Sequence, residues 1–592
     1  MEGLIDNVEN LEDASNKGHA IIERINEACL LEDNSEELWQ SSGMYVKMHD
    51  LIRDLAIWIT SPRSHEESKF LVRVRAELKV PPREEMWEEM QRISLMWNQI
   101  EELPIRPNCP MLVSLSLKNN LELKIIPSSF FELMPKLQIL DLSYTAIQSL
   151  PMSLSLLVNL HALILKHYRS LVVLPPFGEL KELEFIDLSY SAISNLPTGF
   201  GNLVKLKKLN LSSLDWLRRI AHNVISRLLN LEDLRLLKTC VNWASDAVSQ
   251  EVSSATLGEA ATLKRLTTFK ITIPDIDCLE HDVFHRCWPS LRKFTFYIGS
   301  DNWFSDKLCC EKSVQIYGCD HFPHGSKVMI EHAEALGFEK CSGLTRVSQV
   351  AGNSKNLRQL HIHDFTGMNC VIDWRDVGDG ALQRLEMLYL DQLLNLKTPF
   401  EGAVPQRSLQ NLRSIEVSIC GKLRCLFSSS VIEHLELLEE LKVRSCYEME
   451  EIVEGDMLPD NAFPGLRELR LERLYNLTRI ISSTASAFMS LQKMEVYRCP
   501  LLKKLPFCTS IQMIKGQSEW WDAMEWEDEH NKYAKSSDLQ VRHLQLHMFL
   551  QVRDFFAGAF AVYLEPWHLL ESETFGQEII QQTGITFESQ FQ

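Results

Sequence analysis

Aliphatic residues recur at a fixed spacing along the first half of the chain. Residues 137–142 read Leu-Gln-Ile-Leu-Asp-Leu, and the same L-x-x-L/I-x-L pattern begins again at 160, 183 and 206. Each start lies 23 residues after the previous one (160−137, 183−160, 206−183). Because side chains alternate along a strand, each unit predicts one short strand with its aliphatic residues on one side. A single unit cannot bury that side alone, so the units must stack into a curved solenoid.

The spacing also indicates the class of solenoid. A period of 23 residues is typical of leucine-rich repeats, whose units span 20–29 residues. We therefore predict an α/β fold, a leucine-rich-repeat solenoid (horseshoe), over residues 90–515. The pattern weakens at about 238–350, and we expect a distorted or looped-out stretch at 301–325. It returns in six units that begin at 357, 385, 412, 438, 466 and 491, between 25 and 28 residues apart.

The segment before the repeats has a different pattern. Residues 1–62 are expected to be mostly helical, with isoleucines on one face of a helix over 21–29. A short strand is predicted at 45–48, and Asp50 is a suitable N-cap for a following helix. Residues 63–89 contain polar breaks and are expected to form a linker.

The segment after the repeats changes character as well. Residues 516–536 include Trp520 and Trp521 and are expected to cap the open end of the solenoid. Residues 537–592 show no period, so they stay unassigned.

Composition narrows the possible functions. The chain has 592 residues, a net charge of −19 and a pI of about 5.5, which argues against a general binder of phosphate backbones. It shows no signal-peptide pattern and no uncharged apolar stretch of membrane-spanning length. With 15 cysteines, we expect reduced thiols and a cytoplasmic protein. Cys420, Cys446 and Cys499 take the Asn/Cys position of the repeat, where we expect buried thiols and no metal.

Two N-terminal motifs accompany the repeats. Residues 2–31 resemble a winged-helix subdomain, and Val46 to Ala56 resembles a Met-His-Asp motif (Met48, His49, Asp50) followed by its helix. With the repeats and the Trp-rich end, the chain resembles the plant coiled-coil-type NB-ARC leucine-rich-repeat disease resistance proteins. These proteins are intracellular immune receptors, and the resemblance covers roughly residues 1–530.

The resemblance implies a nucleotide-binding role for one histidine. In intact family members the motif histidine, here His49, contacts the β-phosphate of ADP. A helix N-terminus beside it favours anions. The alternative is an ordinary histidine in a turn. No G-x-x-x-x-G-K-[ST] run occurs in the chain, which we interpret as N-terminally truncated. We therefore expect no cofactor here, with weak or no binding of ADP or ATP.

Repeat geometry predicts a binding surface. Residues between the aliphatic positions point to the inner, concave face of the sheet. The candidates for protein binding there are Asp141, Asp187, Asn210, Arg235, His361, Tyr389, Glu416, Lys442, Arg470 and Glu495. The second six are larger and carry both signs of charge, which suits protein recognition. The alternative, that individual positions are only solvated residues of a sheet, stays open.

Other chemistry has weaker support. His361-Ile-His363 places two imidazoles on one strand face, either as metal ligands or as exposed positions of the sheet, and we favour the second. No zinc spacing surrounds Cys309-Cys310, and no hydrolase or metalloprotease motif occurs. The helix over 21–29 exposes Glu23 and Glu27, which would repel phosphates. We therefore expect neither an enzyme nor a nucleic-acid binder.

The leading hypothesis is a truncated intracellular receptor for plant defence. Its repeats would bind a protein, either a pathogen effector, a guarded host protein or a receptor module. Two alternatives remain: a regulator that acts in trans on full-length resistance proteins, and a non-functional or mis-predicted gene fragment.

Overall fold

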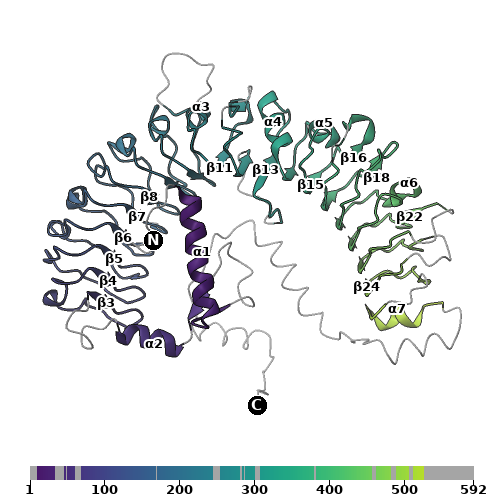
Figure 1. Cartoon of the computed structure of the whole chain (residues 1–592). Helices are drawn as coiled ribbons and strands as arrows, with labels where there is room; N and C mark the ends of the chain where they lie inside the picture. The colour runs from purple at the N-terminus through teal and green to yellow at the C-terminus, as the bar shows by residue number, and fades with distance from the viewer. Residues whose placement is uncertain are drawn as a thin grey trace, which may run out of the picture.

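Each repeat contributes one strand to a parallel sheet, as the aliphatic pattern predicts. In the computed structural model the strands pair in chain order from β3 to β25, and no pairing joins these two ends among the described residues. The sheet is therefore an open arc (Figure 1). This arc confirms the predicted solenoid. The structure describes residues 10–33, 46–48, 50–59, 69–168, 170–243, 254–279, 283–285, 287–299, 307–378, 380, 382–455, 462–481, 488–505 and 511–525.

The strands lengthen from the first half of the arc to the second. Most of the early strands have three residues, whereas β15 and β17 have seven. The strands of the arc are β3 (Phe70–Val72), β4 (Arg92–Ser94), β5 (Ser114–Ser116), β6 (Ile139–Asp141), β7 (Ala162–Ile164), β8 (Phe185–Asp187), β9 (Lys208–Asn210), β10 (Asp233–Leu236), β11 (Thr268–Ile273), β12 (Lys293–Ile298), β13 (Lys312–Tyr317), β14 (Ala335–Glu339), β15 (Gln359–Phe365), β17 (Met387–Leu393), β19 (Ser414–Ser418), β21 (Glu440–Arg444), β23 (Glu468–Glu472), β24 (Lys493–Tyr497) and β25 (Met513–Gly516).

Aliphatic residues in equivalent positions fill the interior. Leu140, Leu163 and Ile186 lie in register on successive strands and are fully buried. Complete burial of such a side chain stabilises the fold by about 1.5–3 kcal/mol. One continuous hydrophobic cluster runs from Leu71 to Met524, so each repeat depends on its neighbours.

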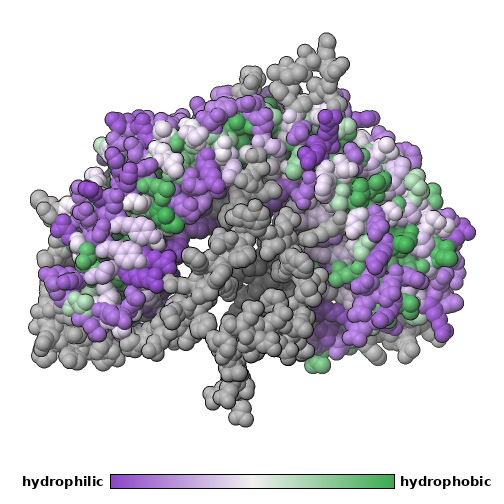
Figure 2. Space-filling model, turned by 180° about the vertical axis from the view of Figure 1, so that it is seen from behind, coloured by the Kyte–Doolittle hydropathy of each residue, from purple (hydrophilic) through white to green (hydrophobic). Residues whose placement is uncertain are grey.

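Short helices and two small parallel sheets form the outer side of the arc (Figure 1). The sheets pair β16 (Cys370–Asp373) with β18 (Thr398–Glu401) and β20 (Phe427–Ser428) with β22 (Val453–Glu454). The α-helices are α3 (Leu257–Ala261), α4 (His324–His332), α5 (Ser348–Ala351) and α6 (Ser429–Ile432). The 3-10 helices are η1 (Glu84–Met86), η2 (Met152–Leu156), η3 (Phe200–Asn202), η4 (Ile225–Arg227), η5 (Ile276–Leu279) and η6 (Trp374–Asp376). Seen from behind, the surface is mostly hydrophilic, with apolar groups in separate patches (Figure 2).

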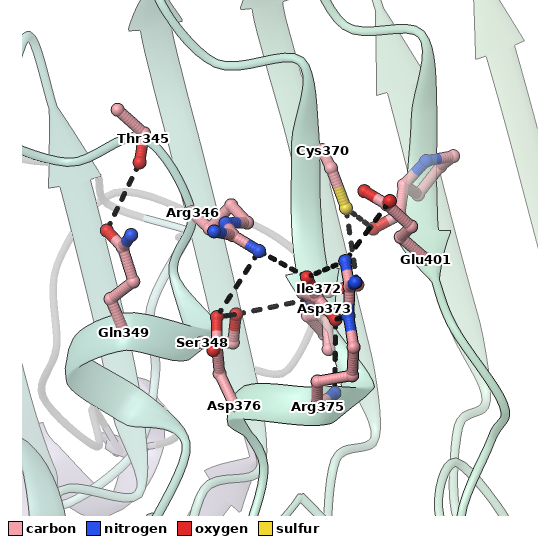
Figure 3. Close-up of polar contacts among 11 residues, drawn as sticks. Thr345, Arg346, Ser348, Gln349, Cys370, Ile372, Asp373, Arg375, Asp376 and Glu401 are labelled. Atoms are coloured by element: carbon pink, nitrogen blue, oxygen red, sulfur yellow. Dashed lines mark hydrogen bonds and ion pairs between the residues drawn. The ribbon is translucent and has the colours of Figure 1, made fainter.

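A buried carboxylate ties neighbouring repeats together on this outer side (Figure 3). Asp373 has 1% of its side chain exposed and forms ion pairs with Arg346 and Arg375. A hydrogen bond from Arg375 Nη2, 2.7 Å from Asp373 Oδ2, is the main reason that the pKa of Asp373 is lowered to about 2. The Asp373 amide donates to Ser348 Oγ in the preceding repeat, at 3.1 Å. The buried charge is therefore fully paired, as burial requires.

The N-terminal segment folds as two helices and a small hairpin-like sheet. Its elements are α1 (Leu11–Glu27), β1 (Leu31–Asp33), β2 (Val46–Met48) and α2 (Asp50–Ile59). Strands β1 and β2 pair antiparallel. Strand β2 confirms the predicted strand over 46–48, while residue 45 lies outside the described residues. The following helix is present, but Asp50 is its first residue and not its N-cap. The first helix starts ten residues earlier than the predicted 21–29 and ends before Cys29, which has a φ of 56°.

Helix α1 stands inside the arc (Figure 1). Asn10 caps it by accepting a hydrogen bond from the Asp13 amide, at 2.8 Å. The Leu11 amide donates to Glu232 Oε2 at 2.7 Å, and Glu12 pairs with Arg292. Glu232 is buried, and a carboxylate at a helix N-terminus is favourable. The contacts of α1 with the solenoid are thus polar, and no residue of α1 itself is buried.

Two expectations about the repeats need correction. Strand β3 lies inside the predicted linker at 63–89 and pairs with β4, and Trp87 in the same stretch is fully buried. The solenoid therefore begins before residue 90. Within the expected looped-out stretch at 301–325, β13 pairs in the sheet on both sides. The pattern was hidden because Glu311 takes the first aliphatic position, although the later core positions stay apolar; residues 301–306 lie outside the described residues.

The C-terminal cap is partly visible. Helix α7 (Ser518–Asp522) follows β25, and Trp520 is 5% exposed. Its indole Nε1–H donates to the Leu502 carbonyl at 2.9 Å, across the last repeat. Residues 526–536, together with 537–592, lie outside the described residues, so the cap at 516–536 stays a prediction in its second half.

Candidate functional site

The predicted concave-face residues form two rows across the sheet. The first row follows strand pairing through Asp141, Ile164, Asp187, Asn210 and Arg235. The second follows it through His361, Tyr389, Glu416, Lys442, Arg470 and Glu495. The structure therefore brings all ten candidates into aligned positions. Nine are half-buried, and Glu495 is buried.

A register shift separates the two rows. Phe296 is the second core residue of β12, yet it pairs with Val314, the first core residue of β13. The next strands keep the new register, in which Val314 is aligned with Leu336. The two rows are thus offset by two residues, so they do not form one continuous line.

In the first row, polar side chains cap turns. Asp141 Oδ1 accepts from the Ser143 amide at 3.0 Å, and Asp187 Oδ1 accepts from the Ser189 amide at 2.9 Å. Asn210 repeats this contact with the next turn. The sequence contains the signal, an Asx residue two positions before Ser, which is typical of a turn cap. These candidates have a local structural role that the interpretation of the row as a binding surface missed.

Arg235 is also paired within the sheet. Its guanidinium contacts both carboxylate oxygens of Asp233, at 2.9 Å for the two shortest contacts. Lys208 approaches the same carboxylate at 3.6 Å. The charge of Arg235 is therefore balanced by its own strand.

In the second row, residues 307–309 lie over three of the candidates: His361, Tyr389 and Glu416. The Cys309 amide donates to Gln359 Oε1 at 2.9 Å, and Lys307 Nζ lies 5.1 Å from the ring centroid of Tyr389. Lys307 also pairs with Glu416 at 3.3 Å. Residues 307–309 thus cross the inner face over β15 to β19, which explains why His361 is not exposed as predicted.

The two histidines of β15 differ in protonation. Burial, and then Lys307, lower the pKa of His361 to about 4. A hydrogen bond with Asp391, with His363 Nδ1 3.0 Å from Asp391 Oδ2, raises the pKa of His363. Their ring centroids are 6.2 Å apart, and the described residues hold no group of His, Cys, Asp and Glu side chains that fits a metal ion.

Farther along the row, charges pair both within a strand and across strands. Glu416 accepts from Arg444 at 2.6 Å, and Lys442 pairs with Glu440 at 2.5 Å. Glu495 lies 3.1 Å from Lys493 Nζ and 3.2 Å from Lys515 Nζ. Burial opposes ionisation of Glu495, but the two lysines prevail and its pKa is lowered. This part of the face presents both signs of charge from β19 to β25.

The cysteine and Met-His-Asp predictions have different outcomes. Cys420, Cys446 and Cys499 are buried, as expected, and every described cysteine is a free thiol. Met48 ends β2, and Asp50 begins α2, where it pairs with Arg53 at 2.8 Å. His49 lies outside the described residues, so its contact with ADP stays a prediction. Among the helices of the described segments, none has the length and apolarity that a membrane crossing requires.

Two family models match the repeats. The model described as "Leucine-rich repeat region" matches residues 90–307. The model described as "Plant disease resistance protein RPS2-like, leucine-rich repeats" matches 311–447 and 403–514. The boundary between the two matches coincides with the register shift between β12 and β13.

Relatives align along most of the chain. Disease resistance protein At4g27190 of Arabidopsis thaliana is 30% identical over 549 residues, which covers 89% of this chain and 54% of that protein. Probable disease resistance protein At4g27220 of the same plant is 33% identical over 535 residues, covering 88% of this chain and 57% of the relative. The chain spans little more than half the length of these relatives. The leucine-rich-repeat protein LIC12759 of Leptospira interrogans aligns with 71% of this chain and 92% of its own, at 20% identity and a TM-score of 0.47.

Proposed function

Because this chain is a member of the leucine-rich-repeat disease resistance proteins of plants, we propose that it is the protein-recognition part of an intracellular defence receptor. The observation that carries the proposal is the alignment with disease resistance proteins over nearly nine tenths of the chain. The ligand is a protein, either a pathogen effector or a host protein that such an effector alters. The proposal assigns no catalytic activity and places the receptor in the cytoplasm.

The inner face from β21 to β25 is the recognition surface in this proposal. Residues 307–309 already occupy the face over β15 to β19, whereas Lys442 and Arg470 lie beyond them. Charged pairs on an open face exchange partners easily, because a half-exposed pair stabilises the protein by only about 0–1 kcal/mol. A protein surface with complementary charges gains orientation from such a row.

Infection assays test the defence role. We expect plants in which the gene is disrupted to lose resistance to at least one member of a pathogen panel. For the surface, charge reversal of Lys442 and Arg470 should abolish the restored resistance in complemented plants. Reversal of Arg424 and Lys504, two exposed cations elsewhere in the same half, serves as the matched control. Unchanged resistance in disrupted plants across the panel contradicts the defence role, and unchanged resistance after reversal contradicts the surface.

The Met-His-Asp motif extends the proposal to nucleotide binding by the whole receptor. In the whole receptor, His49 would contact ADP beside the N-terminus of α2, where free amides favour an anion. The purified chain should bind ADP weakly or not at all, since no phosphate-binding glycine loop occurs in its sequence. Isothermal titration calorimetry measures this directly, and micromolar affinity for ADP would disprove the expectation.

A further inference from the structure

A row of planar rings and cations follows one edge of the first half of the solenoid. Tyr144, His167 and Tyr190 take the same position in successive repeats, just after the strand, and each has a φ near +60°. Their ring centroids are 4.3 Å apart in both pairs, with interplanar angles of 18° and 5°. Bulky residues rarely adopt this left-handed backbone. The same left-handed turn occurs at Trp97, Asn119 and Ser213 in the adjoining repeats, so it belongs to the repeat and places the residues that follow each strand in one row.

Cations lie against these rings at regular intervals. Lys118 Nζ is 5.9 Å from the ring centroid of Tyr144, and Lys166 Nζ is 6.0 Å from that of Tyr190. Arg75 lies over Trp97 in the same way, at 4.9 Å. In each case the cation of one repeat lies against the ring of the next. We call these residues the ring edge: Arg75, Trp97, Lys118, Tyr144, Lys166, His167 and Tyr190.

The cations of the ring edge lack counter-ions. No carboxylate of the described residues forms an ion pair with Arg75, Lys118 or Lys166, in a chain whose net charge is −19. In the second half, by contrast, cations such as Arg358 and Lys493 pair with carboxylates of neighbouring strands at 2.9 and 2.7 Å. The ring edge is thus a positive strip with spare charge, and charge complementarity calls for an acidic partner.

The way the rings pack decides between classes of acidic partner. Single-stranded nucleic acids bind by stacking bases on open ring faces. Here the faces of Tyr144, His167 and Tyr190 are turned toward one another. Tyr190 remains 45% exposed, and the side chains of Lys118 and Lys166 are half-buried, so phenol and ammonium groups are available at this surface. Those groups recognise carboxylates of a polypeptide.

Spacing then selects the conformation of that polypeptide. Lys118 and Lys166 take the same position in alternate repeats, and Arg75 comes from the repeat two before Lys118, one residue farther along its turn. Two strand spacings correspond to roughly 9.5 Å. In a polyproline II helix, residues three apart point to the same side and are separated by about 9.3 Å. An acidic residue at every third position of such a helix therefore matches the cations in turn.

We propose that the ring edge is a docking site for an acidic protein segment in the polyproline II conformation, with a carboxylate at every third residue. The site lies on a different surface from the inner face and does not depend on the proposed recognition of a defence ligand. Arg75 and Trp97 share a groove with Lys79 and with Glu77, Glu101 and Glu122, so carboxylates offset the positive charge at this end and the segment docks mainly at Lys118 and Lys166.

Fluorescence anisotropy with the full chain and labelled peptides tests the proposal. The probe is (Glu-Pro-Pro)5, and we expect it to bind with at least tenfold lower Kd than a peptide with the same residues in which the five glutamates are adjacent. The uncharged (Gln-Pro-Pro)5 should not bind. Equal affinity for the two acidic peptides, no binding of (Glu-Pro-Pro)5 at millimolar concentration, or tighter binding of single-stranded dT20 would overturn the proposal.

Variants locate the binding. Lys118→Glu with Lys166→Glu should weaken binding of (Glu-Pro-Pro)5 at least tenfold, and the glutamine versions of both positions should weaken it by a smaller factor. The matched control, Lys181→Glu with Lys205→Glu, changes two exposed lysines of the same half and should alter Kd less than twofold. Circular dichroism establishes that each variant is folded, and the glutamine pair provides the test should charge reversal prevent folding. Equal loss in the control and the ring-edge variants would contradict the site.

Discussion

The two halves of the solenoid bury their leucines in the same way but treat charge differently. Strands β3 to β9 have three residues each, and most of their polar positions cap turns. A few cations there form ion pairs with the neighbouring repeat, such as Lys208 with Asp233, but those of the ring edge form none among the described residues. The arc strands from β13 to β24, which leave out β16, β18, β20 and β22 of the outer sheets, have five to seven residues, and their cations pair with carboxylates across the sheet. Longer strands place more polar residues side by side, so charges must alternate there to avoid repulsion. The first half is therefore the one with charge to spare for an acidic partner.

The largest loss of stability is expected from substitutions that create a cavity in the core. They also test whether the two halves of the solenoid unfold with equal cooperativity. Leu163→Ala in the first half and Leu388→Ala in the second both remove a fully buried side chain. Each should lower the free energy of unfolding by about 2–5 kcal/mol, because lost burial and a new cavity add. Urea unfolding measures the loss, and hydrogen exchange by mass spectrometry shows how far it spreads. We expect faster exchange to spread farther from Leu163, because the second half has extra pairing in its outer sheets. Equal spread from both sites would contradict this difference between the halves.

The pH dependence of stability is the next largest effect, and it belongs to the second half. Burial lowers the pKa of His361 to about 4, so the unfolded chain takes up a proton near pH 6.5 and the folded chain does not. Stability is therefore lost as pH falls from about 6.5 to 4, by roughly 2–3 kcal/mol from this residue. His361→Gln should remove that loss in urea titrations at pH 7 and pH 5. An unchanged difference between the two pH values would show that His361 does not titrate in this way.

His363 has the opposite effect on the pH dependence of stability and provides the control. The hydrogen bond to Asp391 raises the pKa of His363, so its stabilisation is present below pH 6.5 and is lost as pH rises through the raised value. His363→Gln should therefore lower stability more at pH 6 than at pH 8. A larger loss at pH 8 would contradict the assignment.

Much of the solenoid could be predicted from the sequence, and particular residues show the physical reasons. Residues 137–211 predict their strands well because every core position is aliphatic and the period is constant. Strand β13 was not predicted because Glu311 interrupts the aliphatic pattern, although Val314 and Ile316 are buried in the core. The covering of His361 by residues 307–309 could not be predicted, since it depends on a chain crossing whose direction no local pattern encodes.

The row of candidates shows the same division between local and distant causes. Asp187 lies two residues before Ser189, a local turn signal that was present in the sequence. The ion pairs of Glu495, by contrast, involve Lys493 and Lys515, and Lys515 comes from the next strand. Periodicity therefore predicts which residues share a face, but it does not show which of them are already paired.

A smaller loss of stability would distinguish a turn-capping role from a partner-binding role for the polar residues of the first half. Asp187 accepts from the Ser189 amide, from Ser189 Oγ at 2.6 Å and from Asn210 Nδ2 at 3.1 Å. Asp187→Ala should lower the free energy of unfolding by about 1–2 kcal/mol, because a buried amide loses its acceptor. Asp187→Asn keeps one oxygen acceptor and should lose less. A change in stability below experimental error for Asp187→Ala would return this residue to the set of free binding positions.

The smallest effect on stability concerns residues of alternating charge that directly precede the strands of the second half. Glu334, Arg358, Glu386, Arg413, Glu439 and Arg467 come from successive repeats and are joined by backbone hydrogen bonds. Arg413 pairs with Glu439, but both side chains are more than a third exposed, so Arg413→Gln should lower the free energy of unfolding by no more than about 1 kcal/mol. Arg413→Glu should cost more, since three carboxylates would then be adjacent, and Glu439→Arg combined with it should recover part of the loss. A double-mutant cycle at low and high salt measures this coupling. If the reversed pair recovers nothing at low salt, the alternation of charge does not stabilise the second half, and its difference from the first half lies in strand length alone.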